Sequence, residues 1–74
     1  MLDMEVRIIK DFYGRKLGTI ETDPQGNEVA KDFYGRVLGR YNKALDVTTD
    51  FYGRRISKGN VVASFIFNKG NMPN

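Results

Sequence analysis

Asp11-Phe12-Tyr13-Gly14-Arg15 occurs three times in this chain of 74 residues, because the same five letters return at 32–36 and at 50–54. Three identical pentapeptides at this length mark an internal repeat. In each copy an Asp is followed three residues later by a Gly. The Asp side chain can accept a hydrogen bond from the backbone two residues further along, and the Gly can adopt a left-handed conformation. Each copy therefore predicts the turn of a β-hairpin, a type I turn closed by a Gly bulge.

Short segments that favour extended backbone lie on both sides of each pentapeptide. A different turn, Asp23-Pro24-Gln25-Gly26-Asn27, separates the first hairpin from the second. Further inner turns are expected around 42–44 and 58–60, and a final one at 68–71. No segment of a dozen residues shows helical periodicity without a Gly or Pro in it, so we expect no helix. The predicted strands are 6–10, 16–20, 28–31, 37–41, 45–49, 55–57 and the apolar run 61–67.

The turn glycines set the repeat length. From Gly14 to Gly35, Gly53 and Gly70 the steps are 21, 18 and 17 residues. We expect a single all-β domain over residues 1–74, with repeats at about 5–22, 27–41, 45–57 and 60–74. The predicted architecture is four short antiparallel β-hairpins in a pseudo-fourfold radial meander, like a flower or a small barrel. Residues 1–5 are expected to pair beside 61–67 and so to cover an open sheet edge.

The repeated apolar positions are expected to form the core. Phe12, Phe33 and Phe51 are predicted to fold over their own hairpins and to meet near the centre. Two further sets are predicted to lie on one buried face, because they alternate with Lys10, Lys31 and Thr49. These sets are Ile8, Val29 and Val47 before the turns, and Leu17, Leu38 and Ile56 after them.

The Tyr and Arg of the pentapeptides are the candidate ligand-binding residues. On a purely structural interpretation each Arg pairs with an Asp of its own or the next turn, and each Tyr packs at the turn's edge. On a functional one the repeat gathers aromatic and cationic groups, which suit phosphate, carboxylate, bases or sugars. The candidates are Tyr13, Arg15, Tyr34, Arg36, Tyr52 and Arg54.

Composition narrows the function classes. The chain has no Cys and no His, which removes thiolate zinc sites, the commonest general base and the commonest metal ligand. Its acids are scattered, as at Asp3, Glu5, Asp23 and Glu28, so we predict no catalytic residue, no metal, no cofactor and no enzyme. The first residues lack a signal-peptide layout and no apolar run is long enough to span a membrane. We expect a cytoplasmic protein without a membrane partner.

The pattern Asp-x-x-Gly-Arg-x-Leu-Gly resembles the bacterial four-fold beta flower proteins. It is carried by 11–18 and 32–39, and more loosely by 50–57, where Ser57 replaces the Gly. The resemblance implies four β-hairpins around a pseudo-fourfold axis. It implies no activity.

The predicted function is that of a non-catalytic structural or protein-interaction module. Its partner would be another protein or a second copy of itself, since a chain this small buries a thin core and oligomerisation is a usual remedy. The alternative is a small nucleic-acid- or carbohydrate-binding module that uses the repeated Tyr/Arg turns. A net charge of +3 permits contact with an anionic partner without requiring one.

Overall fold

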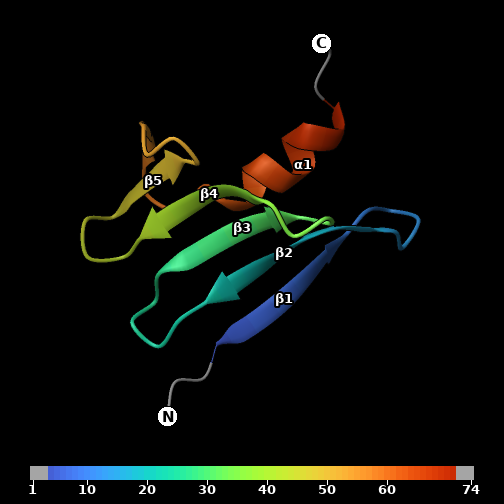
Figure 1. Cartoon of the computed structure of the whole chain (residues 1–74), viewed down its shortest axis with the longest axis horizontal. Helices are drawn as coiled ribbons and strands as arrows, with labels where there is room; N and C mark the ends of the chain where they lie inside the picture. Colours follow the sequence, from blue (N-terminus) through green and yellow to red (C-terminus); the bar gives the residue numbers. More distant parts are fainter. Residues whose placement is uncertain (1–3, 72–74) are drawn as a thin grey trace.

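The computed structural model describes the backbone of residues 4–71 and the side chains of residues 4–67. Over this part of the chain six strands form one antiparallel sheet in sequence order, and one helix follows them (Figure 1). The prediction of an all-β meander is confirmed, and each of the six strands lies within two residues of its predicted ends. The elements are β1 (Glu5–Lys10), β2 (Lys16–Thr22), β3 (Glu28–Asp32), β4 (Val37–Asn42), β5 (Val47–Asp50), β6 (Arg55–Lys58) and α1 (Ala63–Asn71).

Each pentapeptide forms the hairpin turn that the sequence predicts. The three copies connect β1 to β2, β3 to β4 and β5 to β6. Their glycines have φ values of 83° at Gly14, 88° at Gly35 and 86° at Gly53. Residues with a Cβ rarely adopt this conformation, and this explains glycine at the fourth turn position.

A β-bulge lies at the same place in all three hairpins. Ile9 pairs with Gly18 and Lys10 with Lys16, so Leu17 is left without a partner in the ladder. The other two hairpins skip Leu38 and Ile56 in the same way. A bulge inserts one residue, so the strict alternation of faces that we used to predict buried positions does not hold across it.

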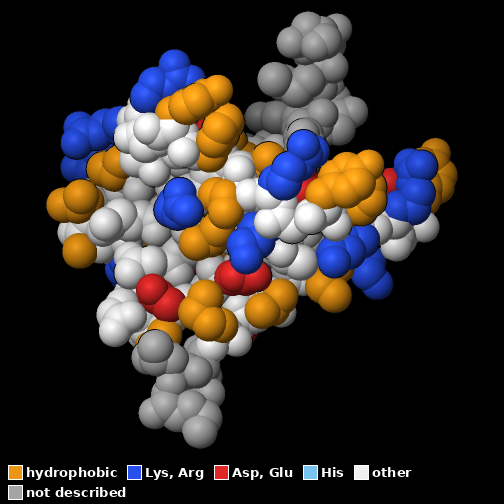
Figure 2. Space-filling model, viewed as in Figure 1, with side chains coloured by type: hydrophobic (Ala, Val, Ile, Leu, Met, Phe, Trp, Pro, Cys, Tyr) orange, Lys and Arg blue, Asp and Glu red, His pale blue; other side chains and the backbone are white. Residues whose placement is uncertain are grey.

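The predicted aromatic core is wrong. Phe12 is 95% exposed, and Phe33 and Phe51 are each 56% exposed. Each Phe is the second residue of its turn, so its side chain projects beyond the strand ends instead of over the sheet. Figure 2 shows hydrophobic side chains protruding at the right-hand end of the molecule, where the β1–β2 turn lies.

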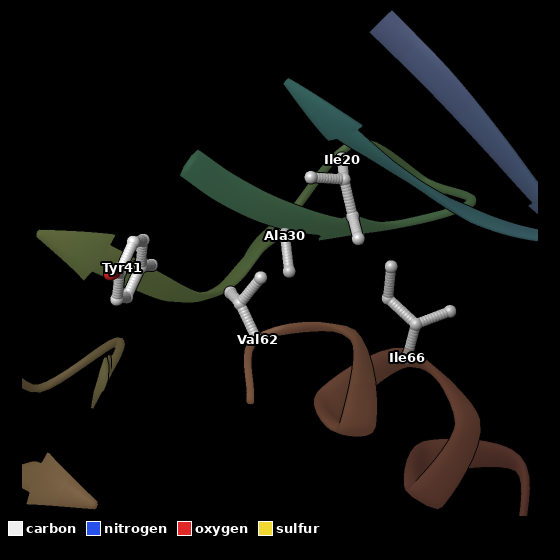
Figure 3. Packing of buried hydrophobic residues seen from close by; sticks show 5 residues of the cluster. All are labelled: Ile20, Ala30, Tyr41, Val62 and Ile66. Carbon is white, nitrogen blue, oxygen red and sulfur yellow. The ribbon is translucent and has the colours of Figure 1, made fainter. Parts of the chain in front are cut away.

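The core lies between one face of the sheet and α1. Side chains from β2, β3 and β4 meet side chains from the helix and from the residue before it (Figure 3). Two of the expected residues, Leu17 and Leu38, pack against this core, and Val47 is buried. Ile8 and Ile56, at 56% and 50% exposure, are not part of it. The central cluster consists of Ile20, Ala30, Tyr41, Val62 and Ile66.

The glycine after each of the first two bulges allows the helix to approach the sheet. A Cβ built on Gly39 would lie 2.5 Å from the Phe65 ring and 2.7 Å from the carbonyl oxygen of Thr49. A Cβ on Gly18 would collide with the carbonyl oxygen of Lys31 and reach Ile66. The third copy has Ser57 here, on β6, and the strands that α1 contacts are β2, β3 and β4.

The prediction of a strand at 61–67 is wrong, and so is that of a turn at 68–71. The chain turns at Gly59 and then forms α1 up to Asn71. The Asn60 side chain accepts the N–H of Val62 at 3.1 Å, as a residue that caps a helix start does. Val62 and Ile66, four residues apart, then face the sheet (Figure 3).

The predicted closure of the sheet by residues 1–5 is also wrong. The partner strand expected at 61–67 is helical, and Glu5 pairs with Thr22 of β2 instead. Residues 1–3 lie outside the described part of the chain. Over residues 4–71 the sheet is open, with β1 at one edge and β6 at the other. Three of the four predicted hairpins are present, and α1 replaces the fourth.

Candidate functional site

The three pentapeptide turns lie at one end of the sheet. Alternate turns of an antiparallel meander fall on the same side, so β1, β3 and β5 all run toward this end (Figure 1). We call this end of the sheet, formed by the three turns with one flanking residue on each side, the three-turn edge. It comprises residues 10–16, 31–37 and 49–55, and it is distinct from the open edges of the sheet along the two outer strands, β1 and β6. The structure thus brings all six candidate Tyr and Arg residues to one edge, in three groups.

The Asp of each turn binds the backbone and the Arg of that turn. In the second turn, Oδ1 of Asp32 accepts the N–H groups of Tyr34 and Arg36, both at 2.9 Å. Its Oδ2 accepts Nε–H of Arg36 at 3.0 Å. The backbone closes the turn as well, because the N–H of Gly35 donates to the Asp32 carbonyl. The first and third turns repeat these bonds around Asp11 and Asp50.

These bonds keep the three carboxylates ionised. Burial by itself would raise the pKa of Asp32, but the N–H and guanidinium of Arg36 and the N–H of Tyr34 outweigh it and lower this pKa. The pKa of Asp50 is lowered by the same balance. For Asp11 the N–H of Arg15 is the largest influence and lowers the pKa. The Asp–Arg pairing of the structural interpretation is therefore present in every turn.

Each Arg also lies over the Tyr of its turn. The guanidinium carbons are 5.3, 5.1 and 5.1 Å from the Tyr13, Tyr34 and Tyr52 ring centroids. Only Nε of each Arg is used by the carboxylate, and the Arg side chains are 74%, 66% and 73% exposed. The outer nitrogens of all three guanidinium groups thus face solvent in a fixed orientation.

The Phe–Tyr pairs are not alike in the three turns. In the second and third turns the rings stack at 4.2 and 4.0 Å, with interplanar angles of 32° and 33°. In the first turn Phe12 stands edge-on to Tyr13, at 5.4 Å and 84°. Phe12 is therefore not stacked on Tyr13, and it is 95% exposed.

The three-turn edge concentrates the positive charge of the chain. It holds seven of the twelve Lys and Arg residues and three of the nine Asp and Glu residues, a net charge of +4 against +3 for the whole chain. The opposite charges within each Asp–Arg pair cancel, and Lys31 forms an ion pair with Glu21 at 3.1 Å. Figure 2 shows blue and orange side chains next to one another at this end, with little red between them. The exposed cations of this edge that remain without an ion pair among the described residues are Lys10, Lys16 and Arg55.

An open groove of about 830 Å³ lies between the first two turns and the helix. Its aromatic lining comes from Phe12 and Tyr13 of the first turn, Phe33 of the second turn and Phe67 of α1. Lys10 and Lys16 lie at its rim, and Ile66 of α1 contributes to its floor. The sequence interpretation missed both lysines, although they flank the first pentapeptide directly.

The opposite end of the sheet has a different character. The turn Asp23-Pro24-Gln25-Gly26-Asn27 uses the same Asp bonds as the pentapeptides, but Asn27 replaces the Arg and its side chain binds the carboxylate of Asp23 at 3.2 Å. In the next turn Asp46 has a φ of 55°, and it accepts the Tyr41 hydroxyl at 2.7 Å. This hydrogen bond is the first cause that raises the pKa of Tyr41. The exposed Tyr–Arg pairs thus belong to the three-turn edge, and the turns at 23–27 and 42–46 are held by other side chains.

Residues 4–71 contain no helix that is long and apolar enough to cross a membrane. Nor do the side chains described include three acidic residues placed to hold one metal ion. Comparison with family models, with curated proteins and with solved structures finds no match to this chain.

Proposed function

We propose that this chain is a non-catalytic binding module that engages a polyanionic partner through the three-turn edge. The observation that carries the proposal is the gathering of three exposed Tyr–Arg pairs at the end where the positive charge is concentrated. A cationic surface raises the local concentration of an anionic partner and speeds association. The fixed Asp–Arg pairs hold the guanidinium groups ready to donate to phosphate or carboxylate oxygens.

The test compares two variants of equal charge. Lys10→Gln/Lys16→Gln removes two cations from the three-turn edge, and Lys43→Gln/Lys58→Gln removes two exposed cations that lie outside it. On a heparin column, the first variant is expected to elute at a clearly lower salt concentration than the wild type, because it loses charge where the polyanion binds. The second variant is expected to elute close to the wild type. Equal losses for both variants would contradict the proposal, and so would binding of neutral oligosaccharides that does not depend on salt.

Self-association is a second candidate, which the open edges of the sheet favour. Among the described strands β1 pairs only with β2, and β6 only with β5. Val6 and Ile8 on β1 are 54% and 56% exposed. An exposed apolar edge strand is a template for pairing with another copy. Light scattering is expected to show a dimer or larger species that Ile8→Lys disrupts, whereas a monomer at all concentrations would exclude this candidate.

We also propose kinship with the four-fold beta flower proteins. Three hairpins with identical turns and bulges support it, whereas the helix in place of a fourth hairpin departs from a fourfold repeat. A crystal structure that shows four hairpins around one axis, within one chain or across an assembly, would establish this kinship.

A further inference from the structure

We infer that the polyanion is a single-stranded nucleic acid, and that one unpaired base stacks in the groove between the first two turns. This inference rests on the proposed function, because it names the partner of the same edge. The first turn differs from its two copies, because Phe12 is not stacked on its neighbouring Tyr.

Phe12 leaves more of its ring free for stacking than the Phe of the other two turns does. Phe33 and Phe51 each cover a face of their own Tyr at about 4 Å, whereas Phe12 is 95% exposed. A large apolar ring that is this exposed gains most by covering itself with another flat apolar surface. Since Tyr13, Phe33 and Phe67 line the same groove, a planar ligand stacked on Phe12 would have further aromatic side chains around it.

The charges around the groove favour a base that is attached to phosphates. Lys10 and Lys16 stand at the rim and have no ion pair among the described residues, and Arg15 presents its outer nitrogens beside them. Single-strand binders combine such cations, which follow the phosphate backbone, with aromatic rings on which bases stack. A run of acidic residues would satisfy the cations but offers no flat ring to cover Phe12.

The spacing of the turns fits a strand that passes along the edge. Alternate turns of a meander are two strand spacings apart, about 10 Å, so the three Tyr–Arg pairs span about 20 Å. A short single strand can follow this path and place its phosphates near successive guanidinium groups. A duplex offers its phosphates but no free base face for stacking, because its bases are stacked on one another.

The experiment measures fluorescence anisotropy of a labelled oligo(dT) of twelve nucleotides at low salt, with a duplex of equal length, heparin and polyglutamate as competitors. Wild-type protein is expected to bind the single strand more tightly than the duplex or polyglutamate. Phe12→Ala is expected to weaken single-strand binding about ten-fold, in the range known for loss of one base–aromatic stack. Phe51→Ala, the matched change in the turn outside the groove, is expected to weaken it less than two-fold. Both variants should keep the wild-type melting curve, because Phe12 and Phe51 are exposed and outside the core.

The dependence of single-strand affinity on salt concentration is a second measurement on the same complex. Lys16→Gln is expected to reduce the slope of log K against log salt concentration by about 0.7, the value for one phosphate contact in a single strand. Equal binding of single strand and duplex, with Phe12→Ala neutral, would overturn this inference and leave polyanion binding intact. Preference for polyglutamate would overturn it in favour of an acidic protein. Failure to bind any of the four polyanions would overturn both the inference and the proposed function.

Discussion

Glycine serves two different purposes in the repeat, and substitution by alanine separates them. Gly39→Ala places a methyl group against the Phe65 ring and the Thr49 carbonyl, so α1 must move away from the sheet. We expect a loss of about 2 kcal/mol or more in the free energy of unfolding. Gly35→Ala meets no atom within 4 Å but keeps a φ of 88°, and should cost only about 1 kcal/mol. Urea unfolding of the two variants measures the difference, and a smaller loss for Gly39→Ala would contradict the close approach of the helix.

The buried turn carboxylates predict how stability depends on pH. The pKa of Asp32 is lower in the folded chain than its ordinary value of 3.8. A depressed pKa contributes stability that is fully present above 3.8 and is lost as the pH falls through the folded-state pKa. Asp32→Asn should therefore be less stable than the wild type at neutral pH, and its stability should change less between pH 4 and pH 2.

Titration of the side-chain carboxyl carbon by NMR tests this directly. The Asp32 resonance is expected to change with a midpoint below 3.8. A midpoint at or above 3.8 would mean that burial outweighs the hydrogen bonds of Arg36 and Tyr34.

At the residue scale the sequence predicted backbone roles better than side-chain positions. Asp11 and Gly14 could be assigned because turn chemistry is local and needs only a few neighbouring residues. Phe12 was assigned to the core because it is large and apolar, but a side chain at a turn tip cannot reach over the sheet. The special position of Phe12 relative to Phe51 could not be predicted, because their local sequences are identical and their surroundings in the fold are not.

At the scale of elements, α1 stabilises the sheet by covering its apolar face. Ile66 is 2% exposed and packs with Ile20 and Ala30. Ile66→Ala should lower the free energy of unfolding by about 2–5 kcal/mol, as for other buried Ile residues. Val61→Ala, just before the helix at a position that is 37% exposed, is the control and should cost less than half as much. Similar small losses for both in a denaturant titration would contradict the helix-on-sheet core.

The helix is the element that was predicted wrongly from the sequence, as a strand over 61–67. The β-branched residues of this segment, Val61, Val62 and Ile66, favour strands, and Gly70 disfavours a helix. Local propensity therefore predicted a strand where the fold has a helix. The available signal was the spacing of four residues between Val62 and Ile66 behind a capping Asn60. The six strands were predictable because each adjoins a recognisable turn. The helix depends instead on a sheet face, opened by Gly18 and Gly39, that exists only after folding.

At the scale of the whole molecule, charge and exposed aromatic rings coincide at one end. The three-turn edge has a net charge of +4, so the rest of the chain is slightly acidic at −1, which follows from the total of +3. The repeat explains the coincidence, because each copy adds one Tyr–Arg pair to the same side of the meander. The sequence indicated the repetition of these groups, whereas their placement on a common edge follows from the order of the strands.

The most direct test of this account maps where a polyanion binds. Amide chemical shifts of the uniformly ¹⁵N-labelled chain are followed during titration with oligo(dT) at low salt. We predict that the largest changes fall on the three-turn edge, residues 10–16, 31–37 and 49–55, with the strongest at the first turn. The turns at 23–27 and 42–46, at the opposite end of the sheet, should change little. Changes centred on those opposite turns, or no changes at all, would contradict the claim that the three-turn edge is the binding surface.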